Sequence, residues 1–164
     1  MIFLGLDPGL TGALAFLEYS KEGNLVGVGV YDTPTLTIVK GKTPCLEYDI
    51  PGMAGCLSQF AKDDTHVIIE NAQAMPKQGV KSTWTTGYGF GIWLGIVAAF
   101  HLPYTRVSPR VWKKALSLNS DKETSRLRAQ QLFPTADLRL RKHHHRSEAL
   151  LLAWYGYTSL LQRG

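Results

Sequence analysis

The sequence has few cysteines and no long apolar run, and each shortage excludes a class of protein. Its two cysteines, Cys45 and Cys56, form neither a CxxC pair nor a zinc-binding spacing, so we expect reduced thiols without a disulfide framework or structural zinc. No apolar stretch approaches the length that spans a bilayer, and the chain opens without the charged and apolar regions of a signal peptide. We therefore expect a cytoplasmic protein without a membrane partner.

Acidic residues are scarce in the second half of the chain, although the overall composition is that of an ordinary globular protein. Of the 164 residues, 45% are hydrophobic and 19% are charged, which suits a single domain, residues 1–164, with its own core. Residues 1–76 carry four lysines against nine acids, whereas residues 77–164 carry fourteen lysines and arginines against four acids. A basic half of this kind favours a polyanion, usually nucleic acid, over a merely solvated basic surface.

Apolar runs and turn residues predict an order of strands and helices. We expect strands at residues 1–6, 12–17, 25–31, 65–70 and 104–107. We expect helices at residues 52–61, 83–100, about 121–133 and about 145–162. Residues 33–49 contain two prolines and are expected to be irregular or to hold an edge extension. Three strands in succession, followed by strand–helix alternation, indicate a three-layer α/β fold with a mixed sheet.

Three carboxylates lie at positions where a charged side chain is unusual unless it binds something. Asp7 directly follows the first apolar strand, and Glu70 follows the three apolar residues that end the fourth. An unpaired buried charge is too costly for a core position, so a carboxylate at a strand end favours a binding role. Glu148 lies beside an Ala-Leu-Leu-Leu-Ala run on the last helix, on a face that should be buried. Each one alone also fits a turn, a strand cap or a surface position.

Together these carboxylates predict a shared cation site. Neighbouring strands lie about 4.8 Å apart, so Asp7 and Glu70 can meet if their strands are neighbours. The last helix would add Glu148 and a residue one turn earlier, either His144 or His145, because i+4 and i+3 positions share a helix face. Carboxylates that converge from separate elements match two-metal phosphodiester cleavage, and a basic surface would hold the rest of a nucleic acid.

Several motifs occur in an order and spacing shared with a known family. They lie at residues 5–9 with 12–13, 68–70, 87–91, 107–109 with 112–113, 122 with 125–126, 132–134 and 146–151. In this order they resemble the RuvC-type Holliday junction resolvases of the RNase H-like superfamily, in particular the phage and plant-chloroplast branches. The resemblance implies an RNase H-like three-layer α/β/α fold with a five-stranded mixed sheet.

The resemblance also implies an activity: paired symmetric nicking of four-way DNA junctions by a homodimer that joins through the helix at 83–100. It implies two ions of Mg²⁺ or Mn²⁺ in each active site, held by Asp7, Glu70, Glu148 and a fourth residue that is usually aspartate. His144 has the preferred spacing for the fourth position, and His145 is the alternative. Histidine is a softer ligand than carboxylate, so it favours Mn²⁺ over Mg²⁺.

Further residues are expected to contact DNA. Bacterial members place an aromatic residue where this chain has Gln73, so Met75 is a candidate apolar wedge at the junction centre, although packing on its own domain is as good an interpretation. The basic residues expected at phosphates are Lys77, Lys81, Arg110, Lys113, Lys114, Arg126 and Arg128.

Three alternatives stay open. The first is a junction-binding protein with weak or no nuclease activity, in which a histidine at the fourth position weakens metal binding. The second is an RNase H-like nuclease that acts on another branched DNA or on RNA. The third reads residues 7–12 as the phosphate loop of a sugar kinase or actin-like ATPase, but that architecture needs two such lobes, and 164 residues supply one.

Overall fold

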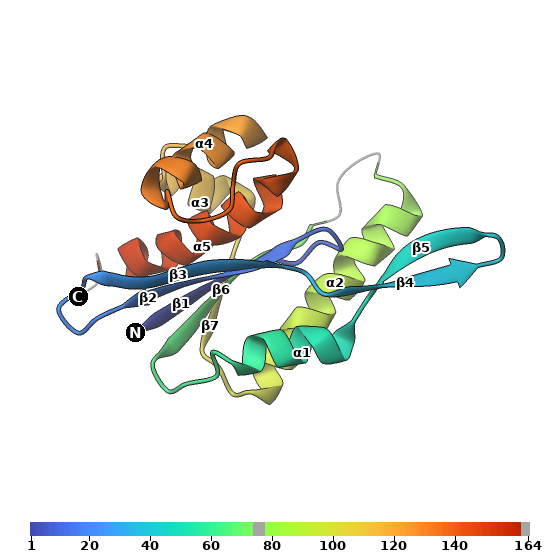
Figure 1. Ribbon diagram of the computed structural model, residues 1–164, viewed down its shortest axis with the longest axis horizontal. Helices are drawn as coiled ribbons and strands as arrows, with labels where there is room; N and C mark the ends of the chain where they lie inside the picture. The colour runs from blue at the N-terminus through green and yellow to red at the C-terminus, as the bar shows by residue number, and fades with distance from the viewer. Residues whose placement is uncertain (74–77, 162–164) are drawn as a thin grey trace.

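Figure 1 shows a computed structural model of the chain, which describes residues 1–73 and 78–161, the last two by their backbone alone. The strands are β1 (Ile2–Asp7), β2 (Ala13–Tyr19), β3 (Leu25–Asp32), β4 (Thr35–Lys40), β5 (Thr43–Tyr48), β6 (Thr65–Glu70) and β7 (Tyr104–Val107). The helices are α1 (Ile50–Ser58), α2 (Val80–Ala99), α3 (Pro109–Ala115), α4 (Lys122–Leu132) and α5 (His144–Leu161), with a short 3-10 helix, η1 (Arg141–His143), before α5. Over these described ranges, no helix is both long and apolar enough for a membrane span.

Five of the strands form one mixed sheet in the order β3-β2-β1-β6-β7. The first three are antiparallel to their neighbours, whereas β1, β6 and β7 run parallel. This confirms the expected α/β fold with a five-stranded mixed sheet. The register sets Leu6 opposite Ile69, so the carboxyl ends of β1 and β6 lie at the same edge and carry Asp7 and Glu70 there.

Helices cover both faces of the sheet, which makes the fold three-layered (Figure 1). Because alternate side chains of a strand point to opposite faces, β1 supplies two separate cores. Phe3 packs with Trp112 and with the apolar residues of α5 on one face, together with α3 and α4. Leu4 and Leu6 pack with residues of α1 and α2 on the other. All six residues of β1 are buried, as its unbroken apolar run predicts.

A close approach between α5 and β1 fixes the height of the helix above the sheet. A methyl group placed at Gly5 would collide with the main-chain carbonyl of Ala149, and one placed at Gly156 would collide with the Ile68 side chain. Glycine is therefore required at Gly5 for this packing, because even alanine would push the helix away. The first turns of α5 are thereby held against the end of β1.

Two elements differ from the sequence expectations. Residues 35–48 form a two-stranded hairpin of β4 and β5, paired at Ile38 and Cys45 and turned at Gly41 with φ +67°. The two prolines suggest an irregular segment, but Pro34 precedes β4 and Pro44 lies within β5 opposite Val39, and the two strands still pair. The seven-residue helix α3 is too short to show a helical period in the sequence.

Candidate functional site

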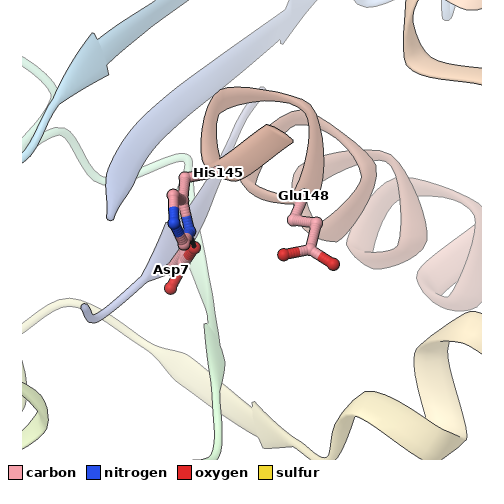
Figure 2. Close-up of side chains that lie close together, drawn as sticks. All are labelled: Asp7, His145 and Glu148. Carbon is pink, nitrogen blue, oxygen red and sulfur yellow. Dashed lines mark hydrogen bonds and ion pairs between the residues drawn. The ribbon is translucent and has the colours of Figure 1, made fainter. Parts of the chain in front are cut away.

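Asp7, His145 and Glu148 converge at the carboxyl end of β1. Figure 2 shows the His145 ring against Asp7, with Glu148 projecting from the next turn of α5 toward the same space. One ligand atom from each of the three lies within 4.8 Å of the others. The two carboxylates are buried, with 9% and 8% of Asp7 and Glu148 exposed. Two carboxylate oxygens and an imidazole nitrogen are ligands that suit a divalent cation, so this cluster is a candidate metal centre.

The His145 ring is held between two partners. Its Nδ1 lies 2.6 Å from Asp7 Oδ2 and donates to that oxygen, and its Nε2 lies 3.3 Å from the hydroxyl of Thr11. The second oxygen of Asp7 accepts a hydrogen bond from the main-chain N–H of Gly9 at 3.3 Å. These contacts orient both side chains before any ligand binds.

Of the two candidate histidines, the structure brings His145 to Asp7. His144, which has the preferred spacing in the sequence, is not part of the cluster with Asp7 and Glu148. Successive residues of a helix differ by about 100° in direction, so neighbouring histidines at the start of α5 point to different partners. His144 Nε2 accepts from Lys122 Nζ at 3.2 Å, on the side of α4. Burial, and then the charge of His145, lower the pKa of His144.

Glu70 lies on the strand next to that of Asp7, but it is not one of the three residues whose ligand atoms lie within 4.8 Å of one another. Its Oε2 accepts a hydrogen bond of 2.7 Å from the indole N–H of Trp112, a fully buried residue of α3. Burial, followed by the negative charge of Asp7, raises the pKa of Glu70 to about 7, against the lowering effect of the Trp112 hydrogen bond. Glu70 is therefore close to half protonated at neutral pH.

Lys113 places a cation directly beside Glu148. Its Nζ donates to Glu148 Oε1 at 2.6 Å, and only 16% and 11% of the two side chains are exposed. The same ammonium lies 5.2 Å from the centre of the Trp112 ring. Lys113 thus faces the candidate metal centre, whereas the sequence expects it at a DNA phosphate.

An ion network fastens α5 to the edge strand β3, at the same end of the sheet as Asp7. Arg146 donates to both oxygens of Asp32 at 2.6 Å and to Asp137 Oδ2 at 3.0 Å. The hydrogen bond from Arg146 is the main reason that the pKa of Asp32 is lowered. Because Arg146 directly follows His145, this network also fixes the direction in which the His145 ring leaves the helix.

The residues expected to contact DNA are placed unevenly. Lys81, Arg110 and Lys114 are exposed, and Arg128 lies half-buried over the ring of Trp154 at 5.5 Å. Arg126 is 9% exposed, and its guanidinium binds Glu123 at 2.6 Å and the main-chain oxygen of Leu138 at 2.8 Å, which leaves little of it for a phosphate. Met75 and Lys77 fall within residues 74–77, outside the described part of the chain.

Sequence reasoning assigns no individual role to Trp112, Thr11 or the Asp32–Arg146 pair. Trp112 and Arg146 fall inside the matched motifs, and a buried indole N–H usually needs a partner, which is the only hint for Trp112 in the sequence. Nothing in the sequence links Asp32 to Arg146, because 114 positions separate them.

Comparison with known proteins finds a curated relative that matches part of this chain. No protein-family model matches the chain. The chloroplastic Holliday junction resolvase MOC1 of Chlamydomonas reinhardtii is 31% identical over 100 residues, which cover 58% of this chain. The match makes up 11% of that relative, so the chain spans about a tenth of its length.

Solved structures of RuvC from Thermus thermophilus match almost the entire chain. The structure of RuvC in complex with a Holliday junction substrate has a TM-score of 0.65 at 17% sequence identity, over 99% of this chain and 96% of that one. The fold is that of RuvC. A further structure of T. thermophilus RuvC has a TM-score of 0.62 at 17% identity, over 99% and 97% of the two chains. The expected resemblance to RuvC-type resolvases and the RNase H-like fold are confirmed.

Proposed function

We propose that this protein is a metal-dependent endonuclease that resolves four-way DNA junctions by paired symmetric nicks. The observation that carries the proposal is the cluster of Asp7, His145 and Glu148 at the carboxyl end of β1, with Glu70 on the neighbouring strand. The RuvC fold supports it, because one of the RuvC structures is a complex with a Holliday junction substrate.

The donor set fits a divalent cation of the Mg²⁺ or Mn²⁺ type. Asp7 and Glu148 supply hard oxygen ligands, and His145 supplies a nitrogen that favours Mn²⁺. When bound, such ions activate the attacking water and stabilise the leaving oxygen of the phosphodiester. We propose two ions in each site, with Glu70 as a ligand of the second, because it is the remaining carboxylate at this edge of the sheet.

The chain's own residues set up the proton chemistry. Glu70 has a pKa of about 7 in the metal-free protein, so at neutral pH the binding of a cation to this carboxyl group releases a proton. Trp112 holds one of its oxygens in place and leaves the other free to face the reacting groups. Lys113 beside Glu148 adds positive charge where a phosphate would develop negative charge in the transition state.

We propose that the protein acts as a homodimer through α2, so that two sites make the paired nicks. The outer face of α2 carries Gly87, Gly91 and Gly95 at four-residue spacing, and a methyl group at any of them would meet no atom within 4 Å. Glycine inside a helix costs about 1 kcal/mol relative to alanine, and nothing within the described residues requires it at these positions. Close approach of a second α2 would explain all three.

The decisive experiment is cleavage of a labelled four-way junction with Mg²⁺ or Mn²⁺. The wild-type protein should give symmetric paired nicks, and Asp7→Asn should abolish them while junction binding persists. Asp63→Asn removes an exposed carboxylate that lies outside the candidate site, and it should leave the cleavage rate unchanged.

Other outcomes identify the alternatives. Tight binding by the wild-type protein without cleavage in either metal would favour a junction-binding protein. Faster cleavage of flaps or RNA than of junctions would favour an RNase H-like nuclease with a different substrate. The single domain at residues 1–164 and the cytoplasmic location stay predictions; the Chlamydomonas relative is named as chloroplastic.

A further inference from the structure

The first turn of α5 is anchored at both ends of one row of the sheet. In the register of the sheet, Asp7 of β1 lies opposite Ala13 of β2, and Ala13 lies opposite Asp32 of β3. Side chains directly opposite each other on antiparallel strands point to the same face, which here is the face that α5 covers. Consecutive residues of α5 bind the two ends of the row, because His145 bonds to Asp7 and Arg146 bonds to Asp32.

The Arg146 guanidinium binds as a fork. Its Nε and one terminal nitrogen each lie 2.6 Å from an oxygen of Asp32, and the other terminal nitrogen donates to Asp137 Oδ2 at 3.0 Å. A bidentate pair of this kind fixes a direction as well as a distance, whereas a lysine supplies a single point charge. The side chains of Arg146 and Asp32 are 21% and 64% exposed, and ion pairs that solvent reaches contribute little to stability. Stability alone is therefore a weak reason for this geometry.

Two anchored side chains determine how α5 is rotated about its own axis. Successive residues of a helix point about 100° apart, so His145 and Arg146 cannot both keep their partners if the helix turns. Gly5 sets the height of the helix above β1, and these two side chains set its rotation. Glu148 shares a face of α5 with His145, three residues before it, so the same rotation decides where the Glu148 carboxylate points.

The two anchors respond differently when a cation binds. The hydrogen bond from His145 to Asp7 joins two side chains of the candidate metal centre. Ligand atoms must give up their protons to bind a metal, so this hydrogen bond is lost if both side chains hold the cation. Arg146 and Asp32 do not belong to the cluster of candidate ligands, so their ion pair is the anchor that remains.

We propose that Asp32 and Arg146 form a positioning pair for the candidate metal centre, an inference that rests on the proposed function. The pair holds the first turn of α5 in one rotation. It thereby keeps His145 and Glu148 directed at Asp7 when the hydrogen bond between His145 and Asp7 is lost. Without the pair, the three candidate ligands separate and a cation binds more weakly, although neither Asp32 nor Arg146 touches it.

The test is isothermal titration of the metal-free chain with Mn²⁺, and the sign of each effect separates positioning from simple electrostatics. By electrostatics alone, loss of the Asp32 charge weakens cation binding, whereas loss of the Arg146 charge strengthens it. Positioning requires both losses to weaken binding. We expect Asp32→Asn and Arg146→Met each to raise the dissociation constant by about fivefold or more. The double variant should lose no more than about twofold beyond the weaker single variant, because it breaks the same pair. Tighter binding by Arg146→Met would overturn the inference.

Two further variants control the comparison. Asp64→Asn is the matched control, because the Asp64 side chain is 57% exposed and pairs with the N-terminal ammonium at 2.9 Å, at the opposite end of β1 from Asp7. It should bind Mn²⁺ as the wild type does. Arg146→Lys keeps the charge and loses the fork, so it should bind Mn²⁺ as weakly as Arg146→Met. Wild-type affinity in Arg146→Lys would overturn the inference. If Arg146→Met does not fold, Asp32→Asn and Arg146→Lys decide the question.

Junction cleavage, measured beside the titrations, separates this inference from the proposed function. Wild-type junction cleavage with Mn²⁺, together with unchanged Mn²⁺ affinity in Asp32→Asn, would remove the positioning role and leave the function. Weaker Mn²⁺ binding in Asp32→Asn and in Arg146→Met, in a protein that cuts no junction, would support the positioning role and remove the function. A wild-type chain that binds no Mn²⁺ would overturn both.

Discussion

At the scale of single residues, Glu70 stands out because its pKa is raised well above that of an ordinary carboxyl group. Burial opposes its charged form, and the charge of Asp7 adds to that effect, so its pKa in the folded protein is about 7. An acid whose pKa is raised on folding destabilises the folded state at every pH at which the unfolded state is ionised, and the cost reaches its full size once the pH exceeds the folded-state pKa. The raised pKa of Glu70 thus lowers the free energy of unfolding in a pH-dependent way, and the rest of the fold must offset this loss.

Replacing this carboxylate should therefore stabilise the metal-free protein. In a chelator at pH 8, Glu70→Gln should be more stable than the wild type by up to about 3 kcal/mol. The gain should shrink as the pH falls through 7 and disappear near pH 4.5, where both states of the wild type carry the proton. Denaturant unfolding at pH 5 and pH 8 measures this, with the exposed Glu47→Gln as the control. A gain of equal size at both pH values would contradict the assignment.

The choice between His144 and His145 is a second question at this scale. Since only His145 contacts Asp7, His145→Asp should complete a carboxylate set and raise cleavage with Mg²⁺ relative to Mn²⁺ by severalfold. His144→Asp is the matched control, one position away, and should leave the ratio of the two rates unchanged. Isothermal titration of each metal provides a reading that does not depend on cleavage. A shift of the ratio in His144→Asp alone would restore the preference for that residue.

At the scale of elements, the short helix α3 contributes more to the site than its length suggests. It supplies the indole that bonds to Glu70 and the ammonium that bonds to Glu148, on consecutive residues. Trp112 is part of the core between α5 and the sheet, so packing and site geometry are set by the same side chain. A loop in this position would not hold both groups.

Removing the ammonium should have opposite effects on stability and on metal binding. Lys113→Met leaves the buried Glu148 without its cation, and should destabilise the metal-free protein by roughly 3 kcal/mol. The same change frees an oxygen of Glu148, so Mn²⁺ should bind more tightly and recover more stability than in the wild type. Thermal unfolding with and without Mn²⁺ measures both effects. Lys114→Met, at the exposed neighbouring position, should show neither.

The elements that the sequence predicts best are those with a clear apolar run between turn residues. The strands β6 and β7 occupy the expected residues, 65–70 and 104–107, and Asp121 caps α4, which lies within the expected helix at about 121–133. The β4–β5 hairpin is hidden in the sequence by two prolines, because a proline is compatible with an edge strand, such as β5, as well as with an irregular loop. Helix α3 was hidden by its length, because seven residues cannot display a periodic pattern.

At the scale of the whole molecule, the proposed paired nicking requires two sites, which the proposed dimer through α2 would supply. The outer face of α2 carries three glycines with free space above them, and it lies on the opposite face of the sheet from α5 (Figure 1). A dimer through this face would leave both metal centres accessible.

Filling the face should separate the two copies without harming the fold. Gly91→Leu adds a side chain where the monomer has room, and it should raise helix stability by about 0.5–1 kcal/mol. Sedimentation velocity should show a monomer, and junction cleavage should change from paired nicks to independent single nicks. Gly55→Leu makes the same change on α1, again into free space, and should remain dimeric. A dimeric Gly91→Leu that still makes paired nicks would exclude this interface.

The sequence anticipates the candidate ligand residues better than their partners. Asp7, Glu70 and Glu148 are expected at one edge because strand ends and helix periods are local properties, and the structure does bring them to that edge. The choice of His145 depends on where α5 begins and on where α4 lies, which are tertiary facts. The hydrogen bond from Trp112 and the ion pair from Lys113 are equally tertiary, because α3 must first pack against β6 and α5.

The glycine at position 5 has a consequence for recognising such sites in other sequences. The separation between the candidate ligand on the strand and the two candidate ligands on the helix is set where the main chain of Ala149 packs on Gly5, two residues before Asp7. A chain with all the same ligands but a larger residue there would hold them at a different separation, and so would select ions of a different radius. A sequence signature for this candidate metal centre is therefore incomplete if it lists only the candidate ligands. It must also include the position that has no side chain.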